Sequence, residues 1–266
     1  MPELVLDLGS HSAKLYRREA SGAVLHRTFA WEIMNRAPER SGPEFINEVF
    51  SSLLHDAPSK EIVAVATAAF RRRPDLAESA FAVCEARGIP LEILGHESEA
   101  HLLQKTMESD LVLAGLFGVN VGGGSIQLYS ADHGTELLSF GTLDLNEHFD
   151  LAGPPDDRRV EDCVSWLMGA MPAWNGEFAY LGEERTYLEH FGVPIRDGWC
   201  DRQAFERLSF GLATCELAEL KARSPFDPGW MTGAVASNCI VLALFSLSTA
   251  TRFRPLNANI GHAVFL

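Results

Sequence analysis

The sequence predicts an α/β fold made of two similar lobes with a cleft between them. Two glycine-containing turns indicate this arrangement, one at residues 9–12 and one at residues 122–125, each directly after an apolar strand-like run. Glycine permits positive φ and close approach of the backbone, so successive N–H groups can converge on an anion, and serine adds a hydroxyl donor. One such turn in each half of the chain predicts two lobes that face one phosphate. The candidate phosphate ligands are Gly9, Ser10, His11, Ser12, Gly122, Gly123, Gly124 and Ser125.

The elements of the first lobe follow from apolar periodicity. Residues 43–55 carry apolar side chains at helical spacing, and short apolar runs on either side indicate strands. The expected elements are strands at 3–8, 13–17 and 23–30, a helix at 43–55, a strand at 62–66, a helix at 75–87, a strand at 91–94 and a helix that contains Glu99. This order is that of a ribonuclease-H-like lobe.

The second lobe restarts near residue 116. Its expected elements are strands at 117–121, 126–129 and 135–140, a helix at 158–171, a strand at 177–181, a short helix from Arg185, an apolar helix at 234–250 and a closing segment at 256–265. The apolar helix is dotted with serine and is interpreted as a buried helix rather than a membrane span. We therefore expect two domains, residues 1–115 and residues 116–266.

Four segments resemble the exopolyphosphatase / guanosine pentaphosphate phosphatase (Ppx/GppA) family of the actin, sugar-kinase and Hsp70 superfamily. The family shows Asp-Leu-Gly-Ser-Asn-Ser, Ala-Thr-(Ser/Ala)-Ala-Leu-Arg, Gly-x-Glu-Glu-Ala-Arg and Asp-Ile-Gly-Gly-Gly-Ser-Thr-Glu, and the similar segments here are residues 7–12, 66–71, 96–101 and 120–127. The resemblance covers nearly the whole chain and implies two actin-like lobes with a cleft between them. It aligns Glu99 with the general base that activates water and Arg71 with the arginine that steadies the transferred phosphoryl group.

The same chemistry follows from the residue types. Hydrolysis of a phosphoanhydride requires a water in line with the bond, a carboxylate that orients it and donors to the phosphoryl oxygens. Glu99 begins an apolar-periodic stretch, so it can project from the first turn of a helix into a cleft. The alternative interpretation is an acidic residue that complements the helix dipole.

The chain departs from the family pattern by losing charges. Asn120 and Gln127 stand where the family has carboxylates for a divalent metal and its water, while Asp7 is retained. The resemblance thus implies Mg²⁺ (or Mn²⁺) held by Asp7, Asn120 and Gln127, with lower affinity because amides carry no charge. Histidines replace other residues at positions 11 and 101. A further hypothesis is that His11, His96, His101 and His262 bind a softer metal or donate to phosphate.

Composition excludes several classes of partner. The formal net charge is −14 and the isoelectric point is near 5, so we expect no nucleic acid and no anionic membrane among the partners. The densest basic run is residues 71–73, which either meets a phosphate or forms a solvated loop. Five widely spaced cysteines and an N-terminus without a basic leader are typical of a cytoplasmic protein. Many family members are dimers, so a homodimer is possible.

These observations favour a phosphatase that removes a terminal phosphate from a small phosphorylated compound, a short polyphosphate or a guanosine pentaphosphate-like substrate. The sequence ends without the additional helical domain of longer family members, which disfavours long polyphosphate. The alternative is a catalytically impaired phosphate- or nucleotide-binding sensor, suggested by Asn120 and Gln127. A third hypothesis, an ATP-dependent kinase, is disfavoured because acidic Glu183 and Glu184 stand where nucleotide-binding relatives have a glycine-rich turn.

Overall fold

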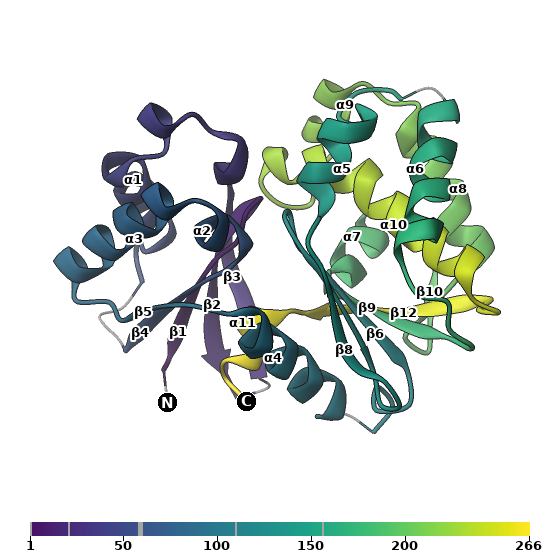
Figure 1. Ribbon diagram of the computed structural model, residues 1–266, viewed down its shortest axis with the longest axis horizontal. Coiled ribbons are helices and arrows are strands. Elements are labelled where there is room, and N and C mark those ends of the chain that lie inside the picture. The colour runs from purple at the N-terminus through teal and green to yellow at the C-terminus, as the bar shows by residue number, and fades with distance from the viewer. Residues whose placement is uncertain (1, 21, 58–60, 110, 156) are drawn as a thin grey trace.

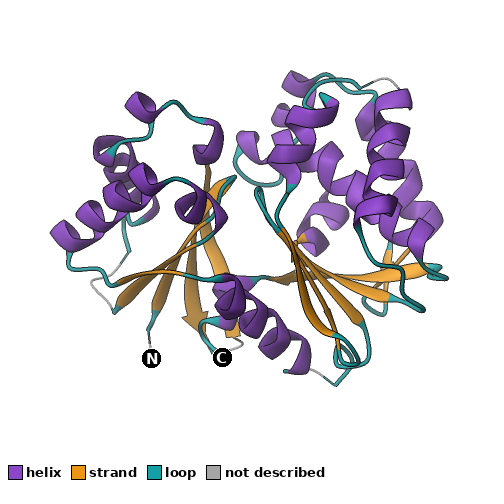
Figure 2. Cartoon of the chain, viewed as in Figure 1, coloured by secondary structure: helices purple, strands orange, loops and turns teal. Residues whose placement is uncertain are grey.

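The computed structural model describes residues 2–20, 22–57, 61–109, 111–155 and 157–266. Figure 1 shows two lobes side by side, each with a twisted sheet. The strand order is β3-β2-β1-β4-β5 in the first lobe and β10-β11-β12-β9-β6-β7-β8 in the second. Most helices lie on one side of these sheets, and α4 and α11 lie on the other side, between the lobes (Figure 2). The predicted α/β fold with two lobes is confirmed.

The first lobe forms the expected strands and helices with small shifts at their ends. Its elements are β1 (Leu4–Leu8), β2 (Ser12–Glu19), β3 (Gly22–Ala30), α1 (Pro43–Leu53), β4 (Ile62–Ala66), α2 (Ala68–Arg72), α3 (Pro74–Arg87), β5 (Leu91–Ile93) and α4 (His96–Glu108), with short 3₁₀ turns at Ile33–Asn35 and Pro38–Arg40. Strand β1 pairs antiparallel with β2 and parallel with β4. Apolar side chains of α1 and α3, among them Phe50 and Leu76, fill the core against this sheet.

The second lobe repeats this plan. Its elements are β6 (Phe117–Val121), β7 (Ile126–Ser130), β8 (Gly134–Leu138), α5 (Thr142–Phe149), α6 (Asp157–Ala170), β9 (Phe178–Glu183), α7 (Glu184–His190), β10 (Ile195–Arg196), β11 (Trp199–Asp201), α8 (Arg202–Ala213), α9 (Leu217–Ala222), a 3₁₀ helix (Pro228–Gly233), α10 (Ala234–Leu247), β12 (Arg252–Ala258) and α11 (Ile260–Ala263). Strand β6 pairs antiparallel with β7 and parallel with β9, just as β1 pairs with β2 and β4. The two glycine turns are therefore equivalent hairpins of two similar lobes.

Helix α10 is the core helix of the second lobe. Its side chains, including Cys239, Ile240 and Phe245, are almost fully buried in the main apolar cluster. The stretch Pro228–Leu247 is long and apolar enough to cross a membrane, judged by length and composition alone. However, 78% of its most apolar part is buried inside the protein. Such burial is what a core helix shows.

The chain links the lobes at two places. Helix α4 ends the first lobe in sequence, yet it also packs on β7 and β8 of the second. Helix α11 follows the last strand of the second sheet and contacts β1 and α4, and Phe265 packs with Val5 and Tyr16 of the first lobe. The C-terminal segment thus returns to the first lobe. The domain boundary expected near residue 115 stays a prediction.

Candidate active site

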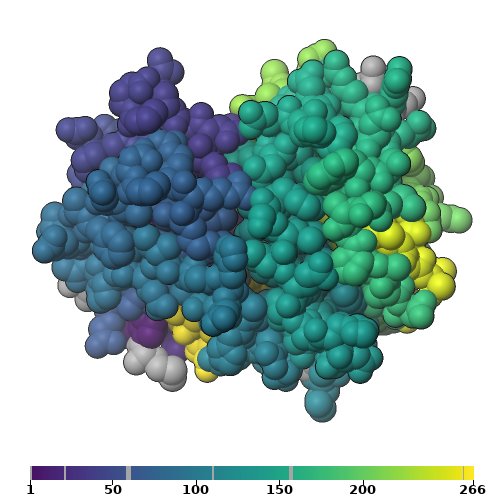
Figure 3. Space-filling model, viewed as in Figure 1, coloured from purple at the N-terminus to yellow at the C-terminus, as the bar shows by residue number. Residues whose placement is uncertain are grey.

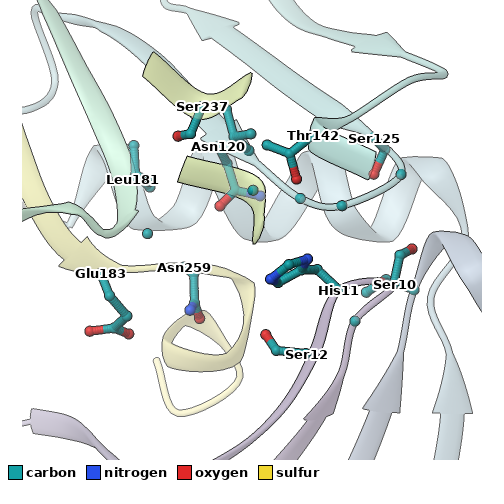
Figure 4. Close-up of a pocket in the computed structure, with 18 of the residues that line it drawn as sticks. Ser10, His11, Ser12, Asn120, Ser125, Thr142, Leu181, Glu183, Ser237 and Asn259 are labelled. Carbon is teal, nitrogen blue, oxygen red and sulfur yellow. The ribbon is translucent and has the colours of Figure 1, made fainter. Parts of the chain in front are cut away.

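A cavity of about 950 Å³, its open mouth included, lies where the two glycine turns face each other. Figure 4 shows Ser10, His11 and Ser12 on one side of this space and Asn120, Ser125 and Thr142 on the other. All eight residues predicted to bind phosphate line it. The site is therefore shared by both lobes, as the pairing of the turns predicts.

The two turns approach each other so closely that the second requires glycine. A Cβ atom on Gly123 would lie 2.8 Å from the backbone nitrogen of His11, and one on Gly124 would lie 2.9 Å from Ser10 Oγ. Each turn is closed by an equivalent bond, Gly9 N–H to the Ser12 carbonyl at 3.0 Å and Gly122 N–H to the Ser125 carbonyl at 2.9 Å. Any side chain at residue 123 would push the lobes apart.

Buried polar atoms without partners gather beside these turns. Ser10 Oγ and both ring nitrogens of His11 have no hydrogen-bond partner of good geometry among the described residues, although the ring lies near the backbone of Gly229 and Trp230. Burial lowers the pKa of His11, so the ring is neutral near pH 7 and presents one N–H donor. Buried polar groups are normally satisfied, so this group of orphans marks a place for a polar ligand.

Buried Glu99 and partly buried Arg71 form an ion pair at the edge of the cavity. Glu99 is 1% exposed and projects from the first turn of α4, and its Oε2 lies 2.9 Å from Arg71 Nη2. Arg71, near the end of α2, also donates to the Leu94 carbonyl at 2.6 Å. Burial raises the pKa of Glu99, and Arg71 opposes that shift. Arg71 lies behind Glu99, outside the set of residues that line the cavity.

A chain of amides connects the second turn to Glu99. Asn120 Nδ2 donates to Gln127 Oε1 at 2.6 Å, and Gln127 Nε2 donates to Glu99 Oε2 at 3.3 Å and to Ser125 Oγ at 3.0 Å. Gln127 thereby uses both ends of its amide inside the protein. A guanidinium and an amide therefore both donate to the same carboxylate oxygen, Glu99 Oε2, and fix its position.

The opposite end of the cavity is acidic. Glu183 and Glu184, where β9 meets α7, are 6% and 4% exposed and line it together with Lys14. Burial raises the pKa of Glu183 to about 7 and that of Glu184 to about 8. Glu183 Oε1 accepts from the Tyr16 hydroxyl at 3.4 Å, whereas Glu184 Oε1 makes no hydrogen bond among the described residues.

Comparison with known proteins identifies the family. The model of the Ppx/GppA phosphatase family matches residues 44–188, more than half of the chain. The chain belongs to the Ppx/GppA phosphatase family. No curated protein matches it.

Solved structures agree on the fold of this Ppx/GppA family member. An exopolyphosphatase from Cytophaga hutchinsonii is similar at 13% identity with a TM-score of 0.78, over 99% of this chain and 96% of that one. The Aquifex aeolicus member of the Ppx/GppA family is similar at 17% identity with a TM-score of 0.70, again over 99% and 96%. An exopolyphosphatase-like protein is similar at 13% identity with a TM-score of 0.75, over 99% and 97%. At these identities the likeness shows the fold alone.

The oxygen atoms in the cleft of this Ppx/GppA chain fit a weak divalent site. Asp7 supplies a carboxylate that is 8% exposed. Asn120 bonds to Gln127 through Nδ2, so its carbonyl oxygen Oδ1 is not used in that bond. Gln127 Oε1 already accepts one hydrogen bond, from Asn120 Nδ2, so the predicted role of Gln127 as a metal ligand stays a prediction. No cluster of three or more His, Cys, Asp or Glu side chains suited to a metal occurs in the described residues. Mg²⁺ commonly takes one or two protein oxygens and completes its shell with water and phosphate.

The histidine hypothesis is corrected by the structure. Only His11 of the four lines the cavity. His96 and His101 are exposed on α4, because Glu99 turns inward and His101, two residues later, falls on the opposite face of the helix. The ring of His262 packs on Tyr16 with centroids 4.5 Å apart, and burial lowers its pKa to about 4.

Sequence reasoning missed several residues of the cleft. Lys14 lines the cavity from β2, which also carries other polar and charged residues, so the sequence does not single it out. Thr142 and Gly233 stand at helix starts close together, since a Cβ on Gly233 would lie 3.2 Å from Thr142 Oγ1. Asn259 and Ser237 reach the cavity from distant segments and carry no local signal.

Proposed function

We propose that this chain is a phosphatase that hydrolyses a terminal phosphate or phosphoanhydride of a small phosphorylated compound. Family membership supports phosphatase chemistry in general. The observation that carries the proposal is the buried Glu99 carboxylate, which lines the same cavity as the two opposed glycine turns and is paired with Arg71 at 2.9 Å. Short polyphosphate and guanosine pentaphosphate-like compounds remain the candidate substrates implied by the family.

In this proposal the glycine turns hold the phosphoryl group. Backbone N–H groups of both turns, together with Ser10, Ser125 and the neutral ring of His11, donate to its oxygens. Glu99 accepts a hydrogen bond from the attacking water and orients it, because its carboxylate is fixed by Arg71 and Gln127. Its raised pKa makes it a better proton acceptor than an exposed glutamate.

Asp7 and the Asn120 carbonyl would hold Mg²⁺ or Mn²⁺ in this scheme. The ion would neutralise part of the charge on the phosphoryl oxygens. Asp7 is suited to this role because burial raises its pKa, and a neighbouring cation relieves the cost of its buried charge. Gln127 acts on Glu99 instead.

The test is phosphate release from short polyphosphate, guanosine pentaphosphate and a panel of nucleotides, with Mg²⁺ or Mn²⁺ present. Wild type is compared with Glu99→Gln and with a matched control, Glu97→Gln, an exposed acid in the same helical turn. Release that falls about 100-fold or more in Glu99→Gln and persists in Glu97→Gln supports the proposal. Equal release from both variants would overturn the role of Glu99.

The amide chain favours a second candidate, a phosphate- or nucleotide-binding sensor. Gln127 directs an N–H donor at Glu99 Oε2, where a carboxylate at this position would offer only acceptors. Such a protein binds phosphate in the same cradle and releases none. Wild type that is stabilised thermally by inorganic phosphate or a guanine nucleotide, without turnover, would support the sensor.

A further inference from the structure

We propose that the acidic end of the cavity, at Glu183 and Glu184, binds a hydroxyl-rich organic group, so that the substrate is a phosphorylated polyol or sugar rather than an inorganic polyphosphate. This inference rests on the proposed phosphate site. It assigns a ligand to the other end of the same cavity, which the mechanism above does not use.

The geometry places both ends in one continuous space. The residues at the glycine turns and those at the start of α7 line the same cavity. In Figure 4, Glu183 lies on one side of the view and Ser10 on the other, with Asn259, Asn120 and the ring of His11 between them. The organic part of a compound whose phosphate is held by the turns can therefore extend through this cavity toward β9.

A buried carboxyl oxygen without a hydrogen bond indicates that this end of the cavity binds a polar ligand. Glu184 is 4% exposed, lines the cavity and leaves Oε1 without a hydrogen bond among the described residues. Beside it, the hydroxyls of Tyr180 and Ser237 lie 2.8 Å apart. A buried carboxyl group without a partner is costly, so a ligand that supplies a hydrogen bond there is bound favourably.

The carboxyl groups at this end of the cavity disfavour a chain of phosphates, because their ionised forms repel it. Four carboxyl groups line the cavity, those of Asp7, Glu99, Glu183 and Glu184, and the basic side chain that lines it is Lys14. An inorganic polyphosphate carries about one negative charge for each phosphate unit and has no hydrogen-bond donor to offer a carboxylate. Extended toward α7 it would meet like charge from the ionised forms of Glu183 and Glu184, whereas a neutral hydroxyl is compatible with both protonation states of these groups.

A hydroxyl group matches this end better than an ammonium group. Burial raises the pKa of both carboxyl groups to values near or above neutral pH, so each is often protonated and can donate as well as accept. A hydroxyl also donates and accepts, and Ser237 and Asn259 add partners of the same kind. An ammonium requires an ionised carboxylate, and the positive charge of Lys14, which lowers the pKa of Glu183, would repel it.

The experiment compares four phosphate monoesters that differ in the organic part with inorganic triphosphate, which is a phosphoanhydride without an organic part. Ethyl phosphate, 2-aminoethyl phosphate, glycerol phosphate, ribose 5-phosphate and inorganic triphosphate are measured for kcat/KM with wild type, and for binding with Glu99→Gln. Glycerol phosphate and ribose 5-phosphate are expected to exceed ethyl phosphate and triphosphate by about 10-fold or more. Triphosphate or aminoethyl phosphate as the preferred ligand would overturn the inference.

Variants then test whether Glu183 and Glu184 cause the preference for hydroxyl-bearing substrates. Glu184→Gln and Glu183→Gln are expected to reduce the ratio of ribose 5-phosphate to ethyl phosphate by about 10-fold, whereas Glu189→Gln, an exposed acid on the same helix, leaves it unchanged. Ser237→Ala serves as a second probe should Glu184→Gln fail to fold. Ratios that no variant changes would contradict the assignment.

The two proposals fail in different ways. Selective binding of polyol phosphates without phosphate release in wild type would refute the phosphatase and support this subsite. Equal release from every compound in the panel would support the phosphatase and refute the subsite.

Discussion

Among single residues, Gln127 departs from the family pattern with the clearest structural consequence. Its Nε2 donates to Glu99 at 3.3 Å. We expect Gln127→Glu to replace this bond with a like charge beside Glu99, and to destabilise the metal-free protein by about 1–3 kcal/mol. Added Mg²⁺ is expected to restore part of the loss. Thermal unfolding with a chelator and with Mg²⁺ measures both effects.

The control for this change is Gln203→Glu, which adds the same charge at an exposed position on α8. It is expected to leave stability and its dependence on Mg²⁺ as in wild type. If Gln127→Glu shows no greater response to Mg²⁺ than this control, residue 127 does not govern metal affinity.

Glu184 makes stability depend on pH in a predictable direction. Burial raises its pKa from 4.5 to about 8, so between these values the folded protein keeps a proton that the unfolded chain releases. The free energy of unfolding therefore falls as pH rises, and this one group contributes a fall of about 2 kcal/mol from about pH 6.5 to about pH 8. Glu184→Gln cannot ionise and is expected to lose this part of the slope. Urea unfolding at the two pH values tests it.

Glu189→Gln removes an exposed charge from the same helix and should keep the wild-type slope. The contribution of Glu183, whose pKa is raised to about 7, remains in both variants. Identical slopes in wild type and Glu184→Gln would show that Glu184 is ionised in the folded protein at neutral pH.

At the scale of elements, the sequence predicts long periodic helices and apolar strands well and short helices poorly. Helix α1 has apolar residues at regular spacing, so its existence follows from the sequence alone. Helix α2 spans Ala68–Arg72, too few residues for a period to appear, and α5 lies in a segment that the sequence analysis left without an element. Both glycine turns and Glu99 were found because they lie within or directly after clear elements.

The parts of the site that escaped prediction depend on contacts distant in sequence. Arg72 was interpreted as either solvated or phosphate-facing, yet its guanidinium donates to the carbonyls of Gly124 and Ser139 and pairs with Asp144 Oδ1 at 3.0 Å. These partners follow 52 to 72 positions later. No local pattern encodes such a contact, because it requires both lobes to be folded and docked.

The second glycine turn rests on α5 through a contact that allows no side chain. A Cβ on Gly141 would lie 2.3 Å from the Gly122 carbonyl oxygen and 2.6 Å from the Gly124 nitrogen. The backbone of the turn must move to admit it, so Gly141→Ala is expected to cost about 2–3 kcal/mol and to weaken binding of inorganic phosphate. Thermal unfolding and calorimetric titration measure the two effects.

Gly153→Ala is the matched control, because a Cβ there meets nothing within 4 Å. It is expected to bind phosphate as wild type does. Equal stability and phosphate affinity in the two alanine variants would mean that the turn adapts without loss, and that its close packing on α5 is not required.

For the whole molecule, function depends on how the two lobes are held together. Each lobe has its own apolar core, and Figure 3 shows the two in contact over the face where residues near 70 meet those near 140. Arg72 joins them there with charge-assisted bonds to Gly124, Ser139 and Asp144. Because one of its acceptors belongs to the second glycine turn, the same side chain that docks the lobes also positions the phosphate cradle.

Arg72→Ala should therefore open the cleft without unfolding either lobe. We expect the dissociation constant for inorganic phosphate to rise about 10-fold, because the closed arrangement that aligns both turns becomes less populated. The neighbouring Arg73 is the control. Its guanidinium bonds to Ile33, Arg36 and Asp75, all within the first lobe. Titration calorimetry gives the affinity, and small-angle X-ray scattering gives the radius of gyration, which should increase in Arg72→Ala alone. An unchanged radius with weakened binding would mean that Arg72 acts only on the turn, and an increase in both variants would place the hinge within the first lobe.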